Sequence, residues 1–134
     1  MPDQSFRTML ANLEQQGELI RFEKEVDPLT NMAAVQYRAY NERGKASLFT
    51  NIAGHDGWKA CSQIIADRRK WAIGLGIDEN ALLNEISARV QQTIDTTTID
   101  AKSAPCKEFI QTGSDVDIHD IPSLMTWIST SDPV

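Results

Sequence analysis

The sequence predicts a small α+β fold in which helices cover one mixed sheet. Three observations support this class: helical and strand-like hydrophobic periods alternate along the chain, three or four strands are visible, and their spacing is uneven. The 134 residues correspond to one ordinary domain, and 41% hydrophobic with 24% charged residues is typical of a chain that buries a core.

The chain is expected to begin with a helix followed by a strand. Asp3 or Ser5 is suited to cap the helix and Gly17 to end it. In residues 18–26 apolar and charged side chains alternate, which predicts a half-buried strand, and Lys24 on its inner face indicates a sheet edge. The apolar stripe of the helix is Phe6, Met9, Leu10 and Leu13.

A second helix and a strand pair are expected next. The helix covers about residues 29–42 and ends at Gly44. Strands over residues 46–52 and 58–65 follow, and the two glycines of residues 53–57 make their connection a turn. These two strands are therefore expected to form a hairpin.

Two further helices are expected before regular patterning stops. Asp67 is suited to cap a short helix, which Gly74 and Gly76 then end. The longer helix spans residues 79–93, with Leu82, Leu83, Ile86 and Val90 as a buried stripe. The deepest residues of the fold are expected to be Leu10, Leu13, Leu83 and Ile86.

The C-terminal part of the chain lacks a clear period. Residues 96–103 are polar and are expected to be a loop, residues 106–111 are expected to be extended, and residues 113–122 are rich in turn formers. We therefore divide the chain into an α+β domain, residues 1–104, and a linker or strand segment, residues 105–134.

Composition argues against several classes of function. With 19 acidic and 13 basic residues the net charge is −6, which disfavours nucleic-acid binding. The basic run 68–70 (Arg-Arg-Lys) is interpreted as a solvated helix start. Cys61 and Cys106 form no CxxC motif, and no signal peptide or membrane span is visible. A soluble cytoplasmic protein is expected.

One cluster has residue types suited to a metal. In an extended chain Asp115, Asp117 and His119 point to the same side, where two carboxylates and an imidazole would converge on a divalent ion. The alternative is a polar turn whose aspartates bond to the local backbone. We favour the turn, because no further ligand is evident.

The remaining candidates also favour structural interpretations. The pair His55-Asp56 lies between glycines at a turn, which is unsuited to a positioned acid–base group. Residues 74–76 (Gly-Leu-Gly) lack the rest of a phosphate-binding motif. Glu23 and Glu25 share one exposed strand face, and no serine or cysteine has a nucleophile motif. The residues alone indicate no active site.

Three blocks in order resemble the UbiD family of decarboxylases. "LEQQGELIRFEKEVDP" resembles the family's opening L-x-x-x-G-E-L and V-D-P, and "DRRKWAIGLGID" its A-x-x-L-G helix. "APCKEFIQTGSDVDIHDIPSLMTW" is similar to P-x-K-E-V-x-x-x-G-x-D-V-D-L-x-x-L-P followed by a threonine and a tryptophan or histidine. Together the blocks cover nearly the whole chain.

The resemblance implies the N-terminal domain of a larger flavin-binding enzyme. Such an enzyme is a carboxy-lyase that adds or removes carboxylate on aromatic or conjugated acids with prenylated FMN (prFMN), a divalent metal (Mn or Mg) and potassium, and is expected to be a homo-oligomer. The family's metal ligands and its Glu-Arg-Glu set have no counterpart here. No catalytic, cofactor-binding or metal-binding residue is therefore assigned, and the chain alone is expected to be inactive.

Two alternatives remain open for the chain as a unit. The end at Pro133-Val134 fits a truncated or proteolysed product, or one subunit of a split enzyme. The second interpretation is a standalone, non-catalytic subunit or interaction module that stabilises or regulates a separate carboxylase subunit.

Overall fold

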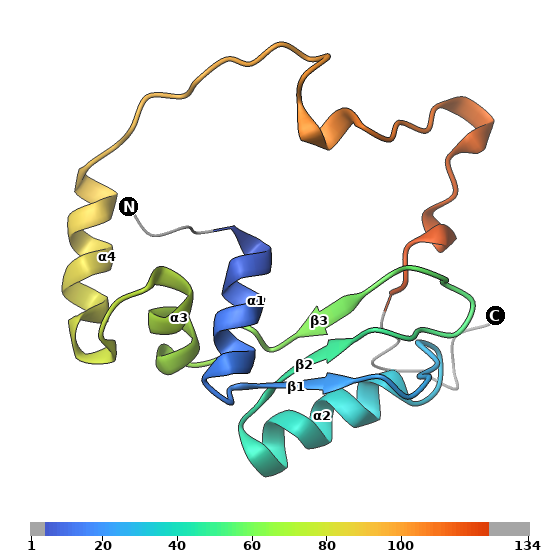
Figure 1. The fold of residues 1–134 in the computed structure, drawn as a ribbon, viewed down its shortest axis with the longest axis horizontal. Coiled ribbons are helices and arrows are strands. Elements are labelled where there is room, and N and C mark those ends of the chain that lie inside the picture. Colours follow the sequence, from blue (N-terminus) through green and yellow to red (C-terminus); the bar gives the residue numbers. More distant parts are fainter. Residues whose placement is uncertain (1–4, 124–134) are drawn as a thin grey trace, which may run out of the picture.

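The computed structural model describes residues 5–123 and confirms the α+β class (Figure 1). The regular elements are α1 (Phe6–Gln15), β1 (Leu19–Phe22), α2 (Met32–Arg43), β2 (Ala46–Phe49), β3 (Ala60–Ser62), α3 (Arg68–Leu75) and α4 (Leu82–Gln91). Short 3-10 turns are η1 (Glu79–Ala81), η2 (Pro105–Lys107), η3 (Gly113–Asp115) and η4 (Ile118–Asp120).

One three-stranded mixed sheet forms the centre of the fold. Its order is β1-β2-β3, with β1 parallel to β2 and β2 antiparallel to β3, so the expected hairpin and the edge position of the first strand are both confirmed. The strands are shorter than expected. Beyond Phe22 the chain pairs again at a single bridge, Val26 to Ile52.

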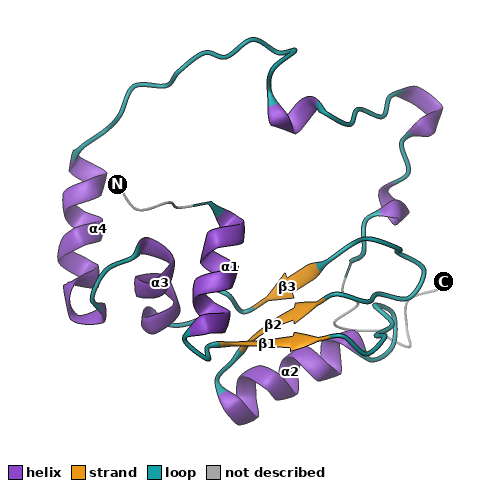
Figure 2. Ribbon diagram, in the orientation of Figure 1, coloured by secondary structure: helices purple, strands orange, loops and turns teal. Residues whose placement is uncertain are grey.

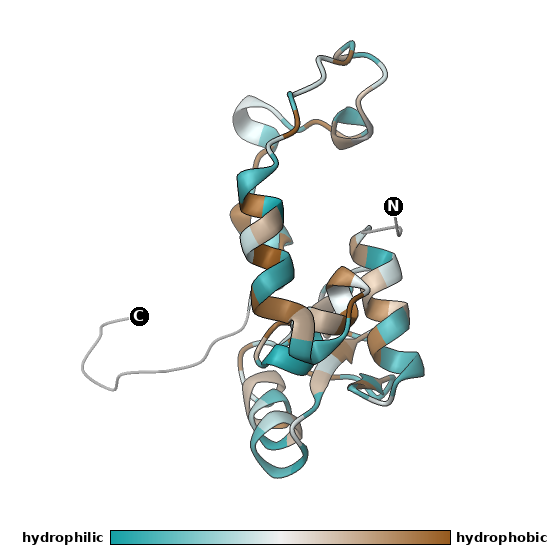
Figure 3. Cartoon of the chain, turned by 90° about the vertical axis from the view of Figure 1, so that its left-hand side faces the viewer, coloured by the Kyte–Doolittle hydropathy of each residue, from teal (hydrophilic) through white to brown (hydrophobic). Residues whose placement is uncertain are grey.

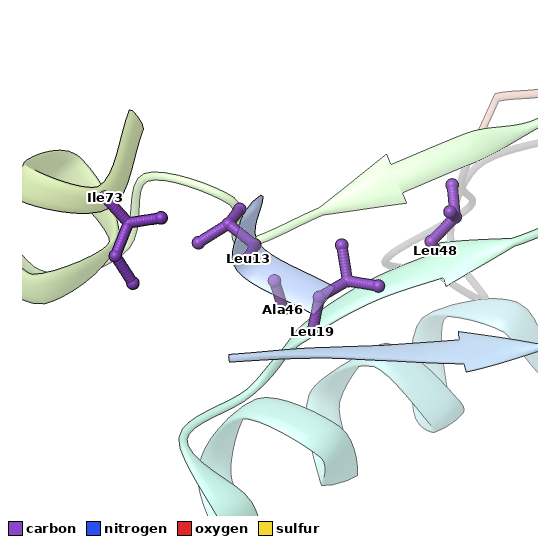
Figure 4. Packing of buried hydrophobic residues seen from close by; sticks show 5 residues of the cluster. All are labelled: Leu13, Leu19, Ala46, Leu48 and Ile73. Carbon is purple, nitrogen blue, oxygen red and sulfur yellow. The ribbon is translucent and has the colours of Figure 1, made fainter. Parts of the chain in front are cut away.

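Helices cover both faces of the sheet (Figure 2). On one face, α1 and α3 pack on the strands through a cluster of Leu13, Leu19, Ala46, Leu48 and Ile73 (Figure 4). On the other, α2 contributes Met32 to a cluster with Val26, Phe49 and Ile52, and the rings of Phe22 and Phe49 stack at 5.3 Å. Successive side chains of a strand point to opposite faces of the sheet, so the strands contribute residues to both hydrophobic clusters.

The helix ends follow the sequence signals. The Ser5 hydroxyl accepts a hydrogen bond from the backbone N–H of Thr8 at 3.2 Å, so Ser5 caps α1, while Asp3 lies outside the described residues. Asp67 caps α3 by accepting from the N–H of Lys70 at 3.0 Å. Gly44 ends α2 with φ of 65°, a left-handed conformation that favours glycine.

Gly74 does not end a helix, contrary to the sequence interpretation. It lies inside α3, which continues to Leu75 and is capped by Gly76 with φ of 67°. A Cβ atom at Gly74 would lie 2.9 Å from the terminal methyl carbon of Met9 on α1. The residue is small because two helices approach each other closely there.

The expected buried stripe of α4 is wrong. Leu82 is buried, but Leu83 is 62% exposed, Val90 is exposed and Ile86 is half-buried. Of the other residues expected to be deepest, Leu13 is fully buried and Leu10 half-buried. The reason is tertiary: α4 packs on α3 and η1 at one edge of the molecule, so one narrow side of the helix is covered.

Residues 92–123, named the arm below, leave α4 and return to the turn between β2 and β3 (Figure 1). The stretch expected to be extended over residues 106–111 forms no strand: its first two residues belong to η2, and no strand occurs among the described residues of the arm. Residues 96–103 contain no helix or strand, as expected for a loop. No described helix is both long and apolar enough to cross a bilayer.

Candidate functional site

A large hollow lies beside α1, over part of the sheet. It is an open groove of about 760 Å³ that runs along α1 from Phe6 to Glu14, with Arg21, Leu48 and residues 56–61 also lining it. Leu10 and Leu48 line it together with two exposed aromatic residues, Phe6 and Trp58. No sequence motif marks this groove, because strand pairing brings its two walls together.

An ion pair occupies one side of the groove. The guanidinium of Arg21 on β1 donates to both carboxylate oxygens of Glu14 on α1, at 2.8 and 2.6 Å. These hydrogen bonds lower the pKa of Glu14 and raise that of Arg21. The pair therefore stays ionised near neutral pH and links helix to strand, without a proton to transfer.

Cys61 also lines the groove but is unsuited to nucleophilic chemistry. Burial of its half-buried side chain raises the pKa of the thiol. A thiolate, and not a thiol, attacks electrophiles, and it requires nearby positive charge or a helix N-terminus. Cys61 is better described as a small apolar residue of the sheet, as the sequence indicated. The exposed Cys106 lies in the arm and is also free.

Lys70 forms the centre of a buried ionic cluster. Its ammonium is fully buried, donates to the Gly44 carbonyl at 2.7 Å and to the Asp67 carboxylate, and lies 3.8 Å from Glu18. The ring of Tyr40 lies 5.8 Å from the same nitrogen. The cluster thus joins the end of α2, the start of α3 and the turn before β1.

Glu18 completes this cluster. Its buried carboxylate receives Arg69 at 3.0 Å and Lys45 at 3.3 Å. The basic run 68–70 is therefore not simply a solvated face: Arg68 and Arg69 are exposed, whereas Lys70 is a core residue. A buried charge of this kind is tolerated because it is paired and hydrogen-bonded.

The structure brings together two segments that the sequence treated separately. His55, at the β2–β3 turn, is half-buried, and its Nδ1 lies 3.2 Å from the Asp120 carbonyl of the arm. Because a carbonyl only accepts, Nδ1 carries the proton. Both His55 and His119 line a pocket of about 450 Å³ with Leu29 and Ile118. The turn is thus less open to water than expected.

The cluster at residues 115–119 is a polar turn. Asp117 caps η4 by accepting from the backbone N–H of His119 at 2.8 Å, and its carboxylate lies 2.7 Å from Nδ1 of the same residue. The backbone hydrogen bond, followed by the ring contact, lowers the pKa of Asp117. The 3-10 turns η3 and η4 interrupt the continuous extended chain that the metal interpretation required: Asp115 lies in η3 and His119 in η4.

The remaining sequence candidates do not assemble into a site. Glu23 and Glu25 are exposed and lie beyond the end of β1, as expected for solvated residues. Residues 74–76 are the end of α3, not a phosphate loop. Among the described residues no group of three or more His, Cys, Asp or Glu side chains is arranged to hold a metal ion.

The described residues do not fit a bound flavin. Its phosphate requires converging cations or a metal held by carboxylates and imidazole, and its ring requires an enclosed apolar cavity. The groove beside α1 is open, has the Glu14 carboxylate at its side, and its Arg21 is already paired. The one buried ammonium, Lys70, is satisfied within the core.

Sequence reasoning missed the ionic cluster and the groove. The i, i+3 spacing of Asp67 and Lys70 was a visible signal for part of the cluster. Glu18 lies 52 residues before Lys70, and no local pattern connects the two. The groove and the His55 pocket likewise depend on contacts between distant segments.

The sequence matches a known protein family, and the fold is similar to several solved structures. A family model described as the 3-octaprenyl-4-hydroxybenzoate carboxy-lyase N-terminal domain, UbiD_N, matches residues 10–90. An evolved dimeric form of the UbiD-class enzyme HmfF from Pelotomaculum thermopropionicum, in complex with prFMN, is similar at 26% identity and a TM-score of 0.80, over 98% of this chain and 30% of that one.

Two further solved structures are similar. Vanillic acid decarboxylase of Sedimentibacter hydroxybenzoicus in open form has 25% identity and a TM-score of 0.81, over 96% of this chain and 28% of that one. Apo 3,4-dihydroxybenzoic acid decarboxylase of Klebsiella pneumoniae has 25% identity and a TM-score of 0.75, over 88% and 27%. The chain spans less than a third of each of these proteins.

Proposed function

Because a model of the UbiD_N family matches more than half of its length, the chain belongs to that family, and we propose that it is the N-terminal part of a prFMN-dependent decarboxylase. The complete enzyme is a carboxy-lyase for aromatic or conjugated carboxylic acids. In this division of labour, residues 1–104 form a supporting domain and residues 105–134 lead into a flavin-binding domain.

The structural likeness to HmfF is the observation that carries this proposal. It extends over 98% of this chain, so the arm is included as well as the sheet and helices. HmfF was solved with prFMN, and the other two relatives are decarboxylases of aromatic acids. Since the match covers 30% of HmfF, most of a UbiD-class chain lies outside the part represented here.

The interactions of the described residues agree with a non-catalytic role for this domain. The acidic and basic groups of the buried cluster pair with each other, and the groove that Glu14 and Arg21 line is open. We propose that prFMN, its divalent metal and potassium bind to the remainder of the enzyme. We also propose a cytoplasmic homo-oligomer, which the free thiols Cys61 and Cys106 permit.

The test compares the chain alone with the chain in a complete enzyme. Incubated with prFMN, Mn²⁺, K⁺ and a panel of aromatic and acrylic acids, the 134-residue chain is expected to release no carbon dioxide above a blank. A fusion that carries this chain in place of the matched segment of the Klebsiella enzyme is expected to decarboxylate 3,4-dihydroxybenzoic acid. Turnover by the chain alone, or an inactive folded fusion, contradicts the proposal.

A further inference from the structure

Helix α4 presents an apolar side that the described residues cover only in part, since Leu83 and Val90 are exposed and Ile86 is half-buried. Leu83, Ile86 and Val90 lie within an arc of about 60° at 3.6 residues per turn, and they are named the α4 stripe below. Leu82, on the neighbouring side, is 4% exposed and faces α3, whereas Leu83 is 62% exposed. Figure 3 views the molecule from the side of α4, where brown, hydrophobic segments alternate with teal, hydrophilic ones along the helix.

The exposed apolar surface continues from α4 into the arm. Ile94, directly after the helix, is 80% exposed. In the rest of the arm most large apolar side chains are exposed to solvent as well. Those that are more than half exposed are Ile99, Phe109, Ile110, Val116, Ile118 and Ile121. So many apolar side chains on one continuous segment mark an interaction surface, because scattered single residues are the norm on a monomer.

The size of this surface indicates what covers it. A helix of ten residues is about 15 Å long, so two copies pairing through the α4 stripe alone would bury far less than the about 1,200–2,000 Å² of a stable interface. The partner must therefore cover the arm as well. The α4 stripe lines neither of the two hollows described above, so it fits a surface partner better than a small ligand; in the arm, Ile118 and Ile121 line the pocket of about 450 Å³ beside His55.

The comparison with HmfF indicates where such a partner comes from. The likeness extends over 98% of this chain, so the arm follows a similar path in a protein whose chain is about three times longer. An arm with exposed apolar side chains and few contacts to its own body keeps a defined path only when it packs on something else. In HmfF the remaining part of the chain is available for that role.

We propose that the α4 stripe and the arm form a docking surface for the flavin-binding part of a UbiD-class enzyme. The α4 stripe holds the supporting domain against that part, and the arm lies along it. This inference deepens the proposed function and rests on it, since it names the surface through which the domain acts.

The experiment uses the fusion with the Klebsiella enzyme and two matched variants. Leu83→Asp places a carboxylate in the α4 stripe, and Asn84→Asp places one on the next exposed residue, about 100° around the helix. Limited proteolysis of residues 92–104 reports whether the arm is covered. Cleavage of the Leu83→Asp fusion is expected to be about tenfold faster than that of wild type, while Asn84→Asp equals wild type.

The outcomes separate this inference from the proposed function. An inactive wild-type fusion contradicts the proposed function, whereas equal cleavage of the Leu83→Asp and Asn84→Asp fusions contradicts the docking surface. A second copy is tested by sedimentation of the 134-residue chain alone. A monomer is expected at all concentrations; a dimer that Leu83→Asp dissociates would overturn the proposal, because the partner would then be another copy.

Discussion

Residues 5–81, the body of the molecule, and residues 82–123 contain similar apolar side chains but place them differently. In the body, Leu13 of α1 and Ile73 of α3 pack on one face of the sheet, and Met32 of α2 packs on the other face. Beyond Leu82, residues such as Val90 and Ile94 lie in water. The body thus gains free energy of folding from its own contacts, whereas most large apolar side chains of α4 and the arm gain little from theirs.

The same contrast holds for charge. The body contains a cluster in which Lys70, Glu18 and Asp67 are buried or partly buried and bonded to one another. The contact between Asp117 and His119 in the arm is local and highly exposed, with 90% of the His119 side chain in solvent. Substitutions in the body are therefore expected to act on stability, and substitutions in the arm on association.

The largest expected effect is on the core of the body. Leu13→Ala should lower the free energy of unfolding of the 134-residue chain by about 2–5 kcal/mol, since it removes a fully buried side chain and leaves a cavity. Leu83→Ala, on the exposed side of α4, should change it by less than about 0.5 kcal/mol. Urea denaturation measures both, and equal losses would show that α4 is part of the same core.

The second effect concerns the buried cluster. Lys70→Met keeps the length of the side chain but removes the donor to Gly44 and Asp67, and should cost about 1–3 kcal/mol. Arg38→Met breaks an exposed pair with Glu42 on α2 and should cost less than about 0.5 kcal/mol. If Lys70→Met is as stable as Arg38→Met, the cluster is not what joins α2 to α3.

The third effect is a dependence of stability on pH. Burial opposes ionisation of Asp67, but the hydrogen bonds from Lys70 and the backbone outweigh it, so the pKa of Asp67 is lowered. A lowered pKa contributes stability above the ordinary aspartate value of about 3.9, and that contribution is lost as pH falls through the lowered pKa. Asp67→Asn keeps the α3 cap but lacks this contribution.

Thermal unfolding between pH 7 and pH 2 checks this dependence. The gap between wild type and Asp67→Asn should be constant at neutral pH and close below about pH 4. Asp95→Asn, in the exposed segment after α4, is the matched control and should show no such gap. A gap that stays constant to pH 2 would mean that the charge of Asp67 contributes nothing.

The smallest expected effect is in the arm. Calorimetry with Mn²⁺, Mg²⁺ or Zn²⁺ should detect no binding tighter than about millimolar, and His119→Ala should behave like wild type, because Asp115 does not join Asp117 and His119. Micromolar affinity that His119→Ala abolishes would restore the metal interpretation and give the arm a chemical role.

Local chemistry made much of the body predictable. Ser5 and Asp67 marked helix starts, Gly44 and Gly76 marked helix ends, and the glycines of residues 53–57 marked the hairpin turn. Each signal works through hydrogen bonds or backbone angles within a few residues, so the neighbouring sequence is sufficient to reveal it.

Sequence patterns favoured structural interpretations of His55-Asp56, of residues 74–76 and of the cluster at residues 115–119. The structure places residues 74–76 at the end of α3 and Asp117 at the start of η4. Prediction failed for Gly74, for the depth of Lys70 and for the side of α4 that is covered. In each case a second element, distant in sequence, decides the environment.

The sequence by itself therefore determined the α+β class, the order of the main elements and several of the residues that cap their helices. The tertiary structure decided which apolar stripe becomes core and which remains surface. The physical reason is that periodicity shows which side of α4 is apolar but not what lies opposite it. Leu13 meets a sheet and is buried, whereas Leu83 has the same spacing and faces open solvent.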